Sequence, residues 1–129
     1  MKVQCSYLLQ NKSRTIEAGI TLLRAESCWT RVLGLLKHTS LPDGFGMLLT
    51  PSSGVHTFGM RFPIDIVALD RKMKVIGCWS DVGPGKIRAV GLRTHSVLEL
   101  GSGQAAAFQI ALGDQLEVTA ALTEATGLW

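Results

Sequence analysis

The chain has 129 residues and a mass of 13.9 kDa, which is the size of one domain. Hydrophobic residues make up 47% of it and charged residues 18%, with a mean hydropathy of +0.26. This composition excludes a disordered chain, which combines low hydrophobicity with high net charge. The glycines follow no Gly-X-Y period, which excludes collagen. We therefore expect a single folded domain over residues 1–129.

The first strong pattern is a strand-like alternation at the N-terminus. Val3, Cys5 and Tyr7 alternate with polar residues, and a second β-prone run follows a polar turn. Residues 1–25 therefore predict a β-hairpin. At Ser27 the period changes to that of a helix, with apolar residues spaced by three and four positions, so we expect one packed helix near residues 27–37.

From residue 45 onward the chain is typical of β structure. Strands are expected over 45–50, 55–59, 63–70, 74–79 and 95–100, a short helix over 104–110, and a last strand that ends near residue 122. Helices do not alternate with strands, which argues against a parallel βαβ sheet. The predicted fold class is mainly β with a minor α part, namely a small antiparallel β-barrel-like or sandwich domain with one packed helix.

The segment between Val55 and Ile66 contains the most unusual grouping of residues. If Gly59 to Phe62 form a four-residue hairpin loop, His56 faces Asp65 across the two strands at a Cβ separation of about 5 Å. Asp65 is surrounded by aliphatic residues, so its carboxylate needs an ion pair or hydrogen bonds. A pair with His56 meets this need; the alternatives are backbone N–H groups, Arg61 or Arg88.

The basic residues concentrate in the middle of the chain. All thirteen lie in residues 1–93, whereas residues 94–129 contain only acidic charges, and the net charge is +3. The main cluster comprises Arg71, Lys72, Lys74, Lys86, Arg88 and Arg93. Binding of nucleic acid would favour interleaved aromatic residues, and these make up only 6% of the chain. We therefore expect no nucleic-acid partner and interpret Arg71–Lys74 as a solvated hairpin tip.

Cysteine and histidine spacing indicates neither a metal site nor a disulfide framework. The three cysteines form no C-x-x-C motif, and an odd count suits a reducing compartment. His38, His56 and His95 lack the spacing of metal ligands. No apolar run is long enough to serve as a signal segment or to span a membrane. The expectations are cytoplasmic localisation, no metal and no cofactor.

A family resemblance covers most of the chain, from about residue 21 to residue 118. The block His56–Asp70 carries it, supported by the motifs at 31–36, 46–49, 97–100 and 113–114. This pattern resembles the bacterial and archaeal family called domain of unknown function 192. The resemblance implies a small, mostly antiparallel β-barrel-like domain, and it implies no activity.

Two functional hypotheses follow. The first is a non-enzymatic accessory domain that binds a small anionic ligand or a protein partner. Its candidate binding residues are His56, Phe58, Met60, Arg61, Asp65, Arg88 and Glu99. Arg61 or Arg88 would hold the anionic group, and Phe58 and Met60 would supply apolar contact. The alternative is a small hydrolase-like enzyme in which His56 acts as general base and Asp65 orients it.

Overall fold

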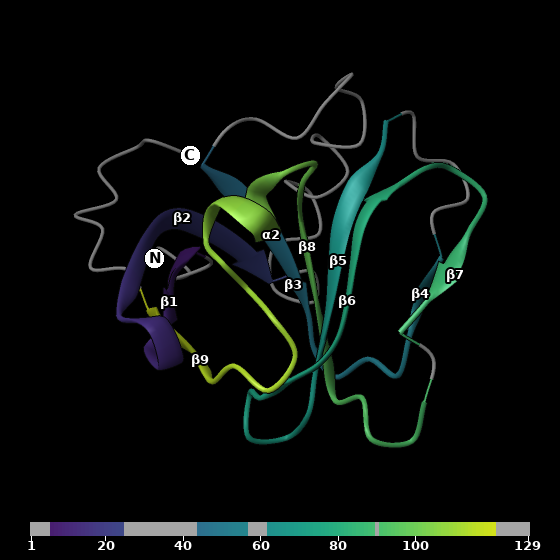
Figure 1. The fold of residues 1–129 in the computed structure, drawn as a ribbon. Helices are drawn as coiled ribbons and strands as arrows, with labels where there is room; N and C mark the ends of the chain where they lie inside the picture. The colour runs from purple at the N-terminus through teal and green to yellow at the C-terminus, as the bar shows by residue number, and fades with distance from the viewer. Residues whose placement is uncertain (1–5, 25–43, 57–61, 90, 121–129) are drawn as a thin grey trace, which may run out of the picture.

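The computed structural model describes residues 6–24, 44–56, 62–89 and 91–120 (Figure 1). Strands dominate these residues, as the sequence predicts. The elements are β1 (Ser6–Asn11), the 3-10 helix η1 (Lys12–Arg14), β2 (Ile16–Arg24), β3 (Phe45–Leu49), β4 (Val55–His56), β5 (Ile64–Leu69), β6 (Val75–Val82), β7 (Ile87–Arg88), β8 (Ser96–Gly101), α2 (Gln104–Ala107) and β9 (Leu116–Ala120). The helix predicted near residues 27–37 lies outside the described residues.

Seven strands form one sheet in the order β6-β5-β8-β3-β2-β1-β9. All neighbouring pairs are antiparallel except β2 and β3, which run parallel. Residues 25–44 connect that pair, and this is long enough for the crossover that parallel strands need. The predicted N-terminal hairpin is confirmed where the chain is described, because β1 pairs with β2 from Ser6↔Leu23 to Asn11↔Ile16.

The sheet is not closed into a barrel, so the domain corresponds to the sandwich-like form of the prediction. Its terminal strands, β6 and β9, approach each other only at their first residues, through the isolated bridge Lys74↔Gln115. From Leu116 onward β9 pairs with β1 and continues away from β6. The remaining two strands, β4 and β7, pair with each other in a separate two-stranded sheet.

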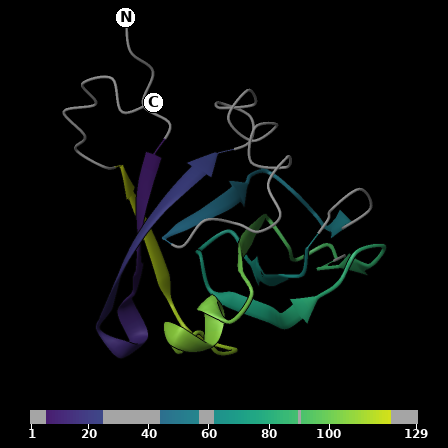
Figure 2. The same ribbon diagram turned by 90° about the horizontal axis from the view of Figure 1, so that it is seen from above.

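Two apolar clusters lie on opposite faces of the large sheet. All six residues of β5 are buried, because both faces of this strand are covered. The first cluster faces α2 and β9; its buried members are Leu9, Leu48, Val67, Leu69, Val75, Leu98, Leu100, Ala105, Ile110 and Leu116. The second faces the β4–β7 side; its buried members are Met47, Phe62, Ile64, Ile66, Ala68, Val82, Ala89 and Val97. Figure 2 shows the β4–β7 pair on one side of the molecule, with β1 and β9 on the other.

The predicted hairpin between 55–59 and 63–70 is wrong. Val55 pairs with Arg88 and His56 with Ile87, whereas β5 pairs with β6 on one edge and β8 on the other. Since both edges of β5 are already occupied, β4 has no free edge there to join. The short helix predicted over 104–110 is found, over the narrower range of α2.

Candidate functional site

Asp65 is fully buried, and backbone N–H groups surround its carboxylate. Its Oδ1 accepts a hydrogen bond from the N–H of Asp81 at 2.9 Å. Its Oδ2 accepts from the N–H groups of Gly103 and Ala105, both at 3.0 Å. The four-residue helix α2 has no side-chain cap of its own, since Gly103 stands at its N-cap position. Asp65 supplies that cap from β5, so the structure supports the backbone alternative for this carboxylate.

Glu99 lies on the opposite face of the sheet from Asp65. Alternation along β5 puts Asp65 on the α2 face, together with Val67, while Ile66 belongs to the other face. Glu99 sits opposite Ile66 in register, and its neighbours Leu98 and Leu100 belong to the α2 face. The two acidic residues of the predicted site are therefore separated by the sheet itself.

Glu99 is a buried residue on the face of the sheet whose apolar cluster includes Phe62 and Ala89. Its register partners are Ile66 on β5 and Met47 on β3, both apolar. Burial raises the pKa of Glu99 to about 7, because the charged form loses hydration without a compensating charge. Within the described segments, Glu99 has neither a hydrogen-bond donor nor a salt-bridge partner; the ion pairs found there are Lys12–Glu117 and Arg14–Asp114.

The strand register places neither His56 nor Arg88 opposite Asp65. His56 lies on β4, which pairs with β7 in the two-stranded sheet, and its backbone pairs with Ile87. The guanidinium of Arg88 donates to the carbonyl of its own neighbour, Ile87, at 2.8 Å. Phe58, Met60 and Arg61 lie outside the described residues. The predicted hairpin pairing of His56 with Asp65 is thus not formed, because β4 and β5 belong to different sheets.

The described part of the chain contains one free thiol and no cluster of metal-ligating side chains. Cys78 is a half-buried free thiol on β6, and burial, aided by the negative charge of Asp65, raises its pKa. A thiol with a raised pKa is a poor nucleophile, which agrees with the inert reading of this residue. No group of three or more His, Cys, Asp or Glu side chains among these residues could hold a metal ion.

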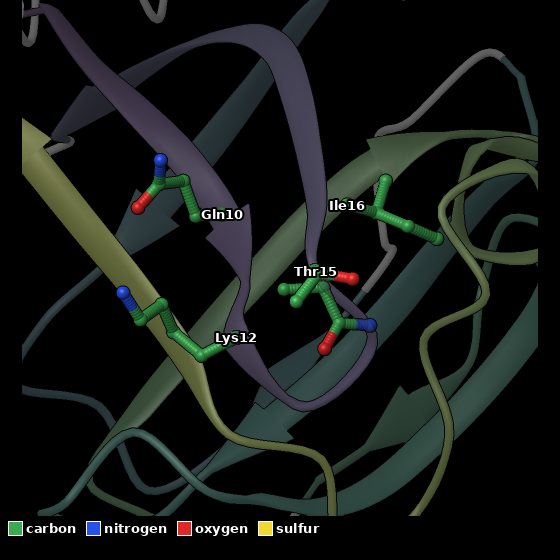
Figure 3. Close-up of a pocket in the computed structure, with 5 residues that line it drawn as sticks. Gln10, Lys12, Thr15 and Ile16 are labelled. Carbon is green, nitrogen blue, oxygen red and sulfur yellow. The ribbon is translucent and has the colours of Figure 1, made fainter.

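A shallow hollow lies at the tip of the β1–β2 hairpin, which the sequence did not single out (Figure 3). It has a volume of about 180 Å³ and is lined by Gln10, Asn11, Lys12, Thr15 and Ile16. The buried member, Asn11, donates to the Asp114 carboxylate at 3.0 Å and to the carbonyl of Phe108 at 3.3 Å. Its amide therefore ties β1 to the chain before β9. That role is structural, and the sequence contains no signal of it, because Asn11 belongs to a polar stretch that is typical of a turn.

Two solved structures have a similar fold. One is a protein of unknown function from Novosphingobium aromaticivorans DSM 12444, with a TM-score of 0.65 and 23% identity, over 87% of this chain and 83% of that chain. The other is named a "putative transcription regulator" from Sinorhizobium meliloti 1021, with a TM-score of 0.66 and 21% identity, over 92% of this chain and 98% of that chain. At such identities the likeness concerns the fold alone.

The sequence matches the profile of one family, although it matches no curated protein. Among the described residues, no helix has the length and apolar character needed to cross a membrane. The profile of DUF192, described as "Uncharacterized ACR", matches residues 9–118, a range that includes β3 to β8 and therefore Glu99. The chain therefore belongs to the DUF192 family.

Proposed function

We propose that the chain is a non-enzymatic binding domain for a small molecule, with Glu99 at the polar centre of its site. The site would lie on the sheet face next to the β4–β7 pair. One observation carries this proposal: Glu99 is 7% exposed, its register partners Met47 and Ile66 are apolar, and the described residues give its carboxyl group no partner. A ligand that donates a hydrogen bond to this carboxyl group would offset the cost of its burial.

The surroundings of Glu99 indicate the chemistry of the ligand. An ionised carboxylate attracts an ammonium or guanidinium group and repels an anion. The neighbouring apolar side chains suit an aliphatic body behind that head group. The proposed ligand is therefore a small amphipathic cation. His56, Phe58 and Met60 precede Phe62, a member of the same cluster, and remain proposed contributors to this site, whereas the cationic Arg61 would repel such a ligand and is not assigned to it.

The hydrolase-like alternative is less well supported. It needs an acid that orients His56, and it assigns this role to Asp65. Asp65 uses both carboxylate oxygens on backbone N–H groups and faces α2. A general base without an orienting partner is a weaker catalyst, so the binding role is preferred.

The test is a titration of the ¹⁵N-labelled chain with butylammonium, butanol and butyrate, followed by NMR. We expect the amide signals of β3, β5 and β8 to shift with butylammonium. Its affinity should increase between pH 6 and pH 8, because ionised Glu99 binds the cation and protonated Glu99 does not. The change Glu99→Gln should weaken this binding at least about tenfold, which corresponds to the loss of one charge-assisted hydrogen bond.

The matched control is Glu117→Gln, the same change at an exposed carboxylate whose Lys12 partner is 3.8 Å away. It should bind butylammonium as the unchanged chain does. Equal binding by Glu99→Gln, or signal shifts confined to other elements, would contradict the proposal. Ester hydrolysis that disappears in His56→Ala would instead favour the enzyme.

A further inference from the structure

Three turns lie side by side at one end of the molecule, the lower edge in Figure 1. They are the β5–β6 turn (residues 70–74), the turn before β8 (91–95) and the turn before β9 (111–115). The N–H of His95 donates to the carbonyl of Leu69 at 2.8 Å, which joins the second turn to the first. On the other flank, the N–H of Gly113 donates to the carbonyl of Val75 at 2.8 Å. We call these residues the three-turn end.

The exposed charges of the three-turn end are mainly positive. Its cations are Arg71, Lys72, Lys74 and Arg93, and all four side chains are exposed. Its two acids are occupied: Asp70 accepts the N–H groups of Lys72 and Lys74 at 2.8 and 2.9 Å, and Asp114 is buried against Arg14. The pKa of Asp70 is lowered mainly by the backbone hydrogen bond from Lys74, and the charges of Lys74 and Arg93 lower it further, which places cations of both turns near this carboxylate. A positive surface of this kind attracts an anionic partner.

Two leucines project from the same end. Leu92 is fully exposed at the tip of the second turn, and Leu112 is 69% exposed at the tip of the third. The basic β5–β6 turn lies between them, because the turn of Leu92 is hydrogen-bonded to one of its flanks and the turn of Leu112 to the other. Insertion into an apolar phase would remove the surface of both side chains from water, which is favourable.

We propose that the three-turn end docks on an anionic lipid bilayer, with Leu92 and Leu112 inserted among the acyl chains and the four cations against the lipid phosphates. A fluid bilayer accepts two separated leucines without a preformed pocket for either. It also supplies a high density of negative charge at the level of the cations. Nucleic acid fits less well, because the three turns carry no Phe, Tyr or Trp on which bases could stack.

The experiment is co-sedimentation of the whole chain with large vesicles. One set is phosphatidylcholine alone and the other contains about 30% phosphatidylglycerol, each at about 50 mM and about 500 mM NaCl. We expect binding to the anionic vesicles at low salt and its loss at high salt. Reversing three charges together, with Arg71→Glu, Lys72→Glu and Arg93→Glu, should lower the partition coefficient at least about 100-fold, since each cation contributes about 1 kcal/mol near such a surface.

The leucines are tested separately, with Leu92→Ser combined with Leu112→Ser. This variant should bind the anionic vesicles at least about fivefold more weakly, because insertion is lost while the charge is kept. The charge control is Lys86→Glu, on the loop between β6 and β7, and the apolar control is Leu8→Ser on β1, where the side chain is 43% exposed. Both controls should bind as the unchanged chain does, and thermal unfolding checks that every variant is folded.

Three results would overturn the proposal. The first is no sedimentation with anionic vesicles at low salt. The second is unchanged binding after the triple charge reversal. The third is an unchanged affinity of the leucine variant, which would mean that the surface attracts anions without inserting. Binding of the chain to polyglutamate with the same leucine dependence would point to an acidic protein in place of a bilayer.

Discussion

The two buried acidic residues of the central strands show how the surroundings of a side chain decide its role. Asp65 and Glu99 both lie in strands that are otherwise apolar. Asp65 receives three backbone N–H groups, and Glu99 receives none from the described chain. Burial without compensation raises the pKa of Glu99 to about 7. One carboxylate thus stabilises the fold, and the other weakens it when ionised.

A first prediction follows for stability against pH. The folded-state pKa of Glu99 lies above its usual value of 4.5, so the folded chain binds more protons than the unfolded chain between pH 4.5 and 7. Stability should therefore decrease as the pH rises through this range, by about 3 kcal/mol in total. The change Glu99→Gln should remove this decrease and leave the variant more stable than the unchanged chain at pH 8.

Urea unfolding at pH 5 and pH 8 measures both effects. Glu117→Gln serves as the control, because Glu117 is half exposed and should leave the pH dependence as it is. If the unchanged chain and Glu99→Gln lose stability in parallel between these pH values, the raised pKa of Glu99 is wrong.

At the scale of elements, the sequence predicted the strands better than their partners. Alternation and apolar runs placed strands at 45–50, 63–70, 74–79 and 95–100, and β3, β5, β6 and β8 lie there. The error was to pair 55–59 with the next strand. Side-chain period reports which face of a strand is buried, but not which edges are occupied. The partner of β4 lies about thirty residues further along the chain, at β7, and nothing local to either strand indicates the other.

A second prediction concerns the packing of β6. A Cβ atom added at Gly77 would lie 2.5 Å from the Trp79 ring. This ring packs against the apolar cluster on the same side of the sheet as Glu99. The change Gly77→Ala should therefore displace the ring and destabilise the chain by about 1–3 kcal/mol. In a Trp79→Leu background the same change should cost much less, since the atom it clashes with is gone.

Chemical denaturation of the four chains of this cycle gives the coupling between the two positions. Gly83→Ala is the control, because a Cβ there meets nothing within 4 Å, and it should leave stability nearly unchanged. An equal cost of Gly77→Ala with and without the Trp79 ring would show that the ring is not what excludes alanine.

For the whole molecule, the open sheet is held together at one end by contacts between distant parts of the chain. Asp114 Oδ2 accepts from Arg14 Nε at 2.8 Å, from Asn11 Nδ2 at 3.0 Å and from the N–H of Ala111 at 3.1 Å. Nearby, the N–H of Gln115 donates to Ser13 Oγ at 2.8 Å. These bonds join the β1–β2 hairpin to the start of β9, about one hundred residues later. The sequence could not predict them, because no spacing rule relates residues so far apart.

A third prediction tests this junction. Burial alone would raise the pKa of Asp114, but the hydrogen bonds from Arg14, Asn11 and Ala111 outweigh burial and lower it. A carboxylate with a lowered pKa stabilises the fold above its unfolded-state pKa, and this contribution is lost as the pH falls through the folded-state pKa, below about 4. The change Asp114→Asn should therefore cost about 1–3 kcal/mol at pH 7 and clearly less at pH 3.

Urea unfolding at both pH values is the measurement, with Glu117→Gln as the control on the same strand region. The Lys12–Glu117 pair is 3.8 Å long and half exposed, so its loss should cost well under about 1 kcal/mol at either pH. The comparison separates a buried junction from a surface ion pair that spans a similar distance in the chain. Equal costs for the two variants at pH 7 would mean that Asp114 stabilises the chain no more than a surface ion pair does. The strand pairing of β1 with β2 and β9 would then hold this end of the sheet together.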